Sequence, residues 1–169
     1  IRYGYIEQLD DELLRISKES FDALSFNCYA LSPDHEKMNH ALETSGLPMI
    51  IGEYHFGTVD RGLAQSLWQV NSQKERGDAF RYYTENAFAH RGLIGTGWFR
   101  WIDQNINGRT DGENYNCGFI DVTDRPYPYM VDAAIETAKS LYEIHSGTKT
   151  PFHQAPNAVG HSPIPNLWE

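Results

Sequence analysis

The chain has 169 residues, with 14 Lys and Arg against 23 Asp and Glu, so its formal net charge is −9. This length allows one domain with a sizeable core. The acidity and the scattered cations argue against a nucleic-acid partner, because binding phosphates requires clustered positive charge. Aromatic residues make up 13% of the chain. That composition suits a neutral sugar or polyol ligand, although a large core also produces it.

The first third of the chain predicts helix, strand and helix. Apolar residues recur at helical spacing over roughly residues 6–19, with acidic residues between them. Residues 21–30 are typical of a strand, and its end carries Asn27 and Tyr29. A second helix is expected from about residue 33, and Gly46 is placed to stop it.

The middle of the chain centres on one carboxylate. Residues 48–57 begin with a continuous apolar run, which predicts a strand buried on both faces, and this run leads directly into Glu53. Residues 57–70 show no clear period and predict a long loop, a feature that is usually functional within a compact domain. Phe80, Tyr83, Ala87 and Phe88 mark a helix that ends near Gly92, and Gly77 weakens the prediction of its first turn.

The last part of the chain predicts a third strand and a final helix. Residues 93–101 are typical of a buried strand, whose glycines indicate close approach of a neighbouring backbone. Residues 103–127, rich in Asn, Asp and Gly, predict a second long loop. One apolar stripe predicts a helix over residues 130–145. The proline-rich residues 146–169 are expected to form an extended tail that lies over another part of the fold.

Strands that alternate with helices imply parallel βα units, so the predicted fold class is α/β. Three strands cannot close a barrel, which needs eight. The strands near residues 22–29 and 93–101 are therefore expected to lie at the two edges of an open sheet. No glycine-rich phosphate-binding turn follows any of the predicted strands.

The chemistry of the chain is concentrated where the three predicted strands end. Parallel strands bring these ends to the same side of the sheet, which would gather a carboxylate, a phenol, an imidazole and indoles into a plausible sugar site. Its members are Asn27, Tyr29, Glu53, His55, Trp98, Trp101 and Asp103. Core packing is the alternative for each aromatic residue, and a structural role is the alternative for His55. In a domain without a sugar site, Glu53 would pair with Lys or Arg.

Metal and membrane signals are missing from the sequence. Cys28 and Cys117 lack metal-ligand spacing, and two free thiols are favoured over a disulfide. The seven His residues form no HExxH pattern. No apolar run of membrane-spanning length and no signal peptide are visible, and the chain starts at Ile1 instead of Met.

Two regions of the sequence resemble a known enzyme family. One is the run Ile51–Gly57 with Asp60-Arg61-Gly62, and the other is Trp98–Gln104 with Gly108-Arg109 and Asp111–Phe119. Together they are similar to β-agarases of glycoside hydrolase family 50, which are retaining enzymes of clan A. They resemble the β-galactosidases of family 42 more loosely. The resemblance covers roughly residues 20–145.

The resemblance implies that residues 1–145 are the carboxyl-terminal part, about strands six to eight, of a (β/α)8 TIM barrel. It makes Glu53 the catalytic nucleophile, with Tyr29 beside it. The substrate-binding candidates are Asn27, His55, Trp98, Trp101, Asp103, Gln104, Glu113 and Asn114. Clan A enzymes carry their acid/base glutamate after an asparagine on strand four, and no Asn-Glu pair fits that position here.

The implied parent enzyme hydrolyses β-galactosidic bonds of agarose or agaro-oligosaccharides with retention, through a glycosyl-enzyme on Glu53. Such chemistry requires no metal or organic cofactor. The rest of the barrel, on the same or another chain, is the expected partner, and this chain alone is expected to be inactive. The resemblance also implies a secreted or periplasmic enzyme. The alternatives are a family 42-type β-galactosidase and a non-catalytic carbohydrate-binding subunit completed by another chain.

Overall fold

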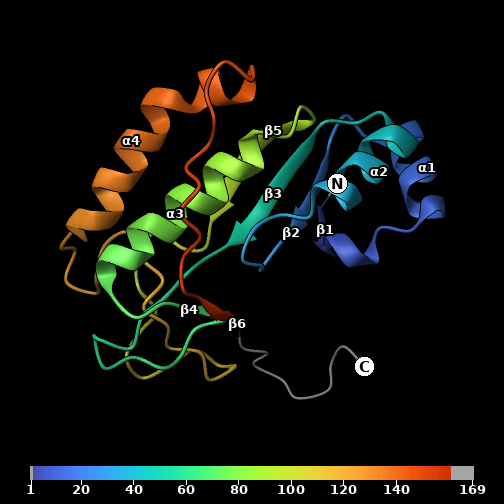
Figure 1. Cartoon of the computed structure of the whole chain (residues 1–169). Coiled ribbons are helices and arrows are strands. Elements are labelled where there is room, and N and C mark those ends of the chain that lie inside the picture. The colour runs from blue at the N-terminus through green and yellow to red at the C-terminus, as the bar shows by residue number, and fades with distance from the viewer. Residues whose placement is uncertain (1, 161–169) are drawn as a thin grey trace.

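The computed structural model describes residues 2–160 (Figure 1). Its elements in chain order are β1 (Arg2–Tyr5), the 3-10 helix η1 (Ile6–Gln8), α1 (Asp11–Ser20), β2 (Leu24–Asn27), α2 (His35–Ser45), β3 (Met49–Tyr54), β4 (Trp68–Gln69), α3 (Gln73–Phe88), β5 (Leu93–Trp98), α4 (Pro128–His145) and β6 (Val159–Gly160).

A four-stranded parallel sheet in the order β1-β2-β3-β5 forms the centre of the fold. The α/β class predicted from the alternation of elements is therefore confirmed. β1 was not predicted, and the expectation that the strand near residues 22–29 lies at a sheet edge is wrong, because β1 pairs with it. The helix expected from residue 6 starts at Asp11 instead, after Asp10 caps it by accepting a hydrogen bond from the Leu13 amide at 2.8 Å.

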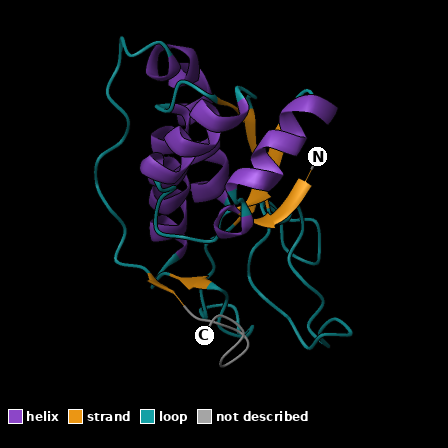
Figure 2. Ribbon diagram, turned by 90° about the vertical axis from the view of Figure 1, so that its right-hand side faces the viewer, coloured by secondary structure: helices purple, strands orange, loops and turns teal. Residues whose placement is uncertain are grey.

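The core lies between one face of this sheet and the helices. Leu24, Phe26 and Ile51 from the strands are fully buried together with Leu14 of α1 and Tyr83 of α3. Burial of each such apolar side chain stabilises the fold by about 1.5–3 kcal/mol. Figure 2 shows the helices massed beside the strands, with the long loops extending beyond them.

The opposite face of the sheet is only half-buried. Ser25, Asn27, Ile50 and Gly52 lie at intermediate exposure, in contrast to the fully buried residues that alternate with them on the helix side. The long loops that follow β3 and β5 gather at the end to which β3 points (Figure 1). The half-buried face of the sheet therefore meets the long loops at the end to which β3 points.

Helix ends follow their sequence signals. α2 begins after Asp34, which accepts hydrogen bonds from the amides of Glu36 and Lys37, and it ends at Gly46 in the left-handed conformation, as predicted. α3 begins at Gln73, about one turn before Gly77, which the sequence placed in the first turn of this helix. Gly77 lies inside α3. A side chain at this position would come within 2.5 Å of the Tyr129 carbonyl oxygen of α4, so only glycine fits here. This glycine allows α3 and α4 to pack closely.

The tail crosses α3 and reaches the loop after β3 (Figure 1). The Phe152 amide donates to the buried Glu85 carboxylate at 2.8 Å, and the Arg81 guanidinium lies 4.6 Å from the centre of the Phe152 ring. Its last described strand, β6, pairs antiparallel with β4. Residues 146–149 turn at the end of α4, and residues 150–160 then lie over α3 as an extended segment. The prolines of the expected tail at positions 163 and 165 lie outside the described residues.

Both cysteines are buried free thiols, as the sequence favoured. Burial raises the pKa of Cys28 to about 11 and that of Cys117 to about 12. Within residues 2–160, no helix is both long enough and apolar enough to cross a membrane. Over the same residues, no group of three or more His, Cys, Asp or Glu side chains is arranged to hold a metal ion.

Candidate active site

A β-bulge brings Glu53 onto the half-buried face of the sheet. Phe26 of β2 pairs with Ile51, and the next residue, Asn27, pairs with Glu53, so the chain gains one residue on β3. Strict alternation would place Glu53 on the helix side with Ile51. The extra residue breaks the alternation, so Tyr54 is buried toward the helices and the Glu53 side chain stays 25% exposed.

Three side chains donate hydrogen bonds to the Glu53 carboxylate. The Tyr29 hydroxyl and the Asn27 amide both donate to Oε2, at 2.9 and 3.0 Å. The Arg2 guanidinium of β1 donates to Oε1 and forms an ion pair with it. Asn27, Tyr29 and Glu53 are thus brought together as the sequence predicted. Pairing with an arginine was expected of a domain without a sugar site, but here the paired carboxylate also has two further donors and remains partly open to solvent.

Tyr29 acts only as a hydrogen-bond donor to this carboxylate. Burial raises the pKa of Tyr29 far above its ordinary value, and the negative charge of Glu53 and the hydrogen bond to it raise that pKa further. The phenol therefore keeps its proton. A neutral donor held against one oxygen orients the carboxylate without neutralising it.

His55 is buried behind Tyr29 and is 1% exposed. Its ring meets the Tyr29 ring edge-on at 5.2 Å between centroids, and its Nε2 accepts a hydrogen bond from the Leu67 amide at 3.3 Å. Burial lowers the pKa of His55 to about 3, and the charge of Arg76 adds to the decrease. The imidazole is therefore neutral, and it joins the loop after β3 to Tyr29 instead of facing solvent.

The two tryptophans of the predicted sugar site are in different environments. Trp98 contacts Tyr54, Phe80 and Phe119 on the helix side, and its indole N–H donates to the Cys117 carbonyl at 2.6 Å. Trp98 is therefore half-buried and packs against the core on the helix side, which is the alternative role given above for each aromatic residue. Trp101 is 68% exposed and stacks on the Phe119 ring. Its indole is an open aromatic surface.

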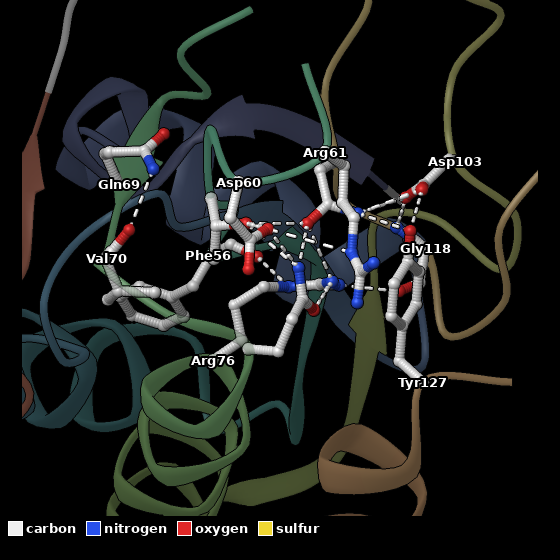
Figure 3. Close-up of polar contacts among 12 residues, drawn as sticks. Phe56, Asp60, Arg61, Gln69, Val70, Arg76, Asp103, Gly118 and Tyr127 are labelled. Carbon is white, nitrogen blue, oxygen red and sulfur yellow. Dashed lines mark hydrogen bonds and ion pairs between the residues drawn. The ribbon is translucent and has the colours of Figure 1, made fainter. Parts of the chain in front are cut away.

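Asp103 lies in a buried polar network and is 4% exposed (Figure 3). Its carboxylate accepts hydrogen bonds from the Gly118 amide, the Tyr127 hydroxyl and the Asn116 amide, at 2.6–3.0 Å. The same Asn116 accepts from the fully buried Arg76, whose guanidinium also lies over the Tyr127 ring at 5.0 Å. Asp103 therefore holds the loop after β5 against α3 and does not face a ligand.

Gln104, Glu113 and Asn114 also stabilise the long loops. Gln104 is fully buried and donates to the Glu113 carboxylate at 2.7 Å, while Asn114 accepts from the Ala64 amide of the other loop at 3.0 Å. Glu113 nevertheless remains 22% exposed. Its charge raises the pKa of Tyr29, so Glu113 lies within electrostatic reach of the Glu53 site.

Two residues near Glu53 were not anticipated from the sequence. Arg2 comes from the strand that was not predicted. Phe99, directly after β5, lies 5.9 Å from the His55 ring and 5.9 Å from the Arg109 guanidinium, measured between ring centres and to the guanidinium carbon. Phe99 belongs to the Trp98–Gln104 run, and its amide donates to the Tyr54 carbonyl at 2.8 Å, where the register between β3 and β5 is irregular.

The chain is an α/β segment of parallel strands with an oriented carboxylate at the end of β3. The fold recurs in solved structures of glycoside hydrolases. At 18% identity, a β-glucuronidase from Faecalibacterium prausnitzii superposes with a TM-score of 0.54 over 78% of this chain and 24% of that one, which shows the fold alone. No protein-family model matches the chain.

The more similar relatives are β-agarases of glycoside hydrolase family 50. β-Agarase A of a Vibrio species is 39% identical over 128 residues, which is 72% of this chain and 13% of that protein. The structure of an exo-β-agarase is 36% identical with a TM-score of 0.74, over 79% of this chain and 18% of that one. An agarase named AgWH50C is 37% identical with a TM-score of 0.76, over 81% of this chain and 20% of that one.

These comparisons confirm the similarity to family 50 β-agarases that the two sequence runs predicted. The chain spans only about an eighth of the length of the curated relatives that it matches, since 13% of each is covered. The match therefore concerns one segment of an agarase.

Proposed function

We propose that this chain is the segment of a β-agarase-type glycoside hydrolase that supplies the catalytic nucleophile, Glu53. The single observation that carries the proposal is the Glu53 carboxylate at the end of β3, held by Tyr29, Asn27 and Arg2. A carboxylate nucleophile must be oriented for attack, and these three donors hold the Glu53 carboxylate in place. The likeness to agarases makes a β-galactosidic bond of agarose or agaro-oligosaccharides the substrate.

In the proposed reaction, a carboxylate oxygen of Glu53 attacks the anomeric carbon while the leaving oxygen is protonated. A glycosyl-enzyme forms on Glu53, and water then hydrolyses it with overall retention. The general acid that protonates the leaving group would lie about 5 Å from Glu53, as in retaining glycosidases. That group comes from the part of the clan A barrel outside this chain. The chemistry calls for no metal or organic cofactor.

In the complete enzyme, β1, β2, β3 and β5 would be strands five to eight of a (β/α)8 barrel. The pairing of β1 with β2 adds one strand to the three expected from the sequence. The half-buried face of the sheet would then face the barrel interior. The exposed indole of Trp101 would pack on the apolar face of a sugar ring, with Glu113 on the same loop as a polar neighbour.

The proposal is tested in a chimera in which residues 2–160 replace the matching segment of Vibrio β-agarase A. The chimera should release agaro-oligosaccharides, and Glu53→Gln should remove nearly all turnover while preserving substrate binding. A fluorinated galactoside that traps glycosyl-enzymes should label the peptide containing Glu53, as read by mass spectrometry. A Glu53→Gln chimera that keeps a tenth of the parent rate would show that Glu53 is not the nucleophile, because losing a covalent nucleophile costs several kcal/mol of barrier.

Residues 1–169 expressed alone should not hydrolyse any glycoside. The general acid, worth roughly 10²–10⁴-fold in rate, lies outside the segment in this proposal. Hydrolysis by a folded monomer of this chain at the chimera's rate would place the acid within residues 1–169. Two alternatives remain. A non-catalytic carbohydrate-binding subunit predicts no labelling of Glu53. A family 42-type β-galactosidase predicts activity on simple β-galactosides. A secreted or periplasmic location is part of the same proposal.

A further inference from the structure

Arg2 makes two contacts at the Glu53 site at the same time. Its Nη2 donates to the Asn27 Oδ1 at 2.9 Å and also to the Glu53 Oε1. Asn27 in turn donates through Nδ2 to the Glu53 Oε2. The three side chains, one from each of β1, β2 and β3, therefore form a closed ring of hydrogen bonds.

This ring determines which end of the Asn27 amide faces Glu53. A carboxamide has an acceptor end and a donor end, and rotation about its last bond exchanges them. A guanidinium has only donors, so Arg2 can bind only the amide oxygen. With the oxygen held by Arg2, the NH₂ group is directed at Glu53. Without Arg2, the amide oxygen could turn toward the carboxylate and repel it.

The room for Arg2 comes from Gly52. A side chain at position 52 would lie 3.3 Å from the Arg2 Nε, 3.3 Å from the Asn27 Oδ1 and 2.9 Å from the Ser25 Oγ. The residue before Glu53 therefore leaves space for the guanidinium on the half-buried face of the sheet.

Stability does not account for this arrangement. The Arg2 and Glu53 side chains are 53% and 25% exposed, and ion pairs between exposed side chains add little to the stability of a fold. Arg15 and Asp11 form a comparable exposed pair on α1, 3.3 Å apart, and Asp11 also bonds to the His40 ring at 2.7 Å. Neither of these contacts involves the Glu53 site.

We propose that Arg2 is a positioning residue, which fixes the Asn27 amide and the Glu53 carboxylate in the orientation needed for attack. This inference rests on the proposed function. Each carboxylate oxygen has two lone pairs, so Oε1 can bind Arg2 and still present a lone pair to the substrate. Arg2 thus acts through Asn27 and Glu53 and need not touch the sugar.

The test uses the same chimera with Arg2→Met, which keeps a long side chain but removes every donor, and Arg2→Lys, which restores a cation. Arg15→Met is the matched control. Arg2→Met should lower kcat about 10- to 100-fold with KM changed less than about twofold, because small misplacements of a reacting group have effects of this size. Arg2→Lys should recover much of the loss, and Arg15→Met should leave kcat unchanged.

Gly52→Ala provides a second, independent variant, which crowds Arg2 without removing its charge and should also lower kcat. A neutron crystal structure of the Arg2→Met chimera, which distinguishes the amide nitrogen from its oxygen, gives a readout besides activity, and it should show the Asn27 amide turned or displaced from Glu53. Parent-like kcat in both Arg2→Met and Gly52→Ala, or an unchanged Asn27 amide, would overturn the inference. The proposed function would survive that result if Glu53→Gln is inactive, whereas an active Glu53→Gln would instead defeat the proposed function.

Discussion

Removal of the Tyr29 hydroxyl is the most direct test of how Glu53 is held. Tyr29→Phe deletes one hydrogen bond of 2.9 Å to the Oε2 of a carboxylate and keeps the aromatic ring against His55. Hydrogen bonds to charged groups contribute about 1.5–3 kcal/mol. Since ~1.4 kcal/mol is a factor of ten, kcat of the chimera should fall about 10- to 150-fold.

The control is Tyr3→Phe, which also deletes one phenol hydroxyl from the same sheet. Tyr3 bonds to the Ser17 Oγ at 2.6 Å on the helix side, away from Glu53. This variant should lower the melting temperature slightly and leave kcat unchanged. Initial rates on an agaro-oligosaccharide give kcat and KM for both variants.

The pH profile adds a second criterion for Tyr29. Because burial and the charge of Glu53 raise the pKa of Tyr29, the phenol stays protonated throughout the working pH range. Tyr29→Phe should therefore lower the whole profile without removing a basic limb. A kcat within twofold of the parent, or loss of a basic limb, would refute the assignment of Tyr29 as a neutral donor to the nucleophile.

Three further predictions concern the surroundings of the site. Trp101→Ala should weaken oligosaccharide binding by about 1–3 kcal/mol, measured by calorimetry, whereas Trp98→Ala should chiefly lower the melting temperature because the half-buried Trp98 packs against the core. Equal binding losses in both variants would contradict this distinction. Asp103→Asn should destabilise the fold by about 3–5 kcal/mol, since it removes the negative charge that acts most strongly on the buried Arg76, and an unchanged melting temperature would exclude that role. The pKa of His55 is lowered to about 3, so as the pH falls from about 6.5 toward 4 only the unfolded chain takes up this proton and stability declines. His55→Gln should make the melting temperature less dependent on pH in that range, and an equally steep decline would show that His55 is not the group responsible.

Much of the fold could be predicted from local patterns. The alternation of apolar runs with helical periodicity gave the α/β class, and Asp34 and Gly46 marked the ends of α2. The continuous apolar run before Glu53 predicted β3 and placed this carboxylate at a strand end. The grouping of Asn27, Tyr29 and Glu53 followed, because parallel neighbouring strands end on the same side of a sheet.

Other elements depend on partners that are distant in the sequence. β1 has only four residues and no apolar run, and its pairing with β2 defines it. β4 consists of two residues within a predicted loop and exists through its pairing with β6. Such short strands have weak intrinsic preference, so hydrogen bonds to remote strands determine whether they form.

The orientation of the site residues was decided by the tertiary structure. Whether a strand side chain faces the helices or the half-buried face depends on register, and one extra residue reverses it. The bulge at β3 turns Glu53 toward Arg2 and Asn27, while the irregular register between β3 and β5 pairs Trp98 with Tyr54, so that the Trp98 ring packs against the core. By itself the sequence determined that a carboxylate ends a buried strand beside a phenol and an amide. Only the pairing of the strands decided which side chains share its face, because bulges arise from hydrogen bonding between chain segments and leave no local pattern.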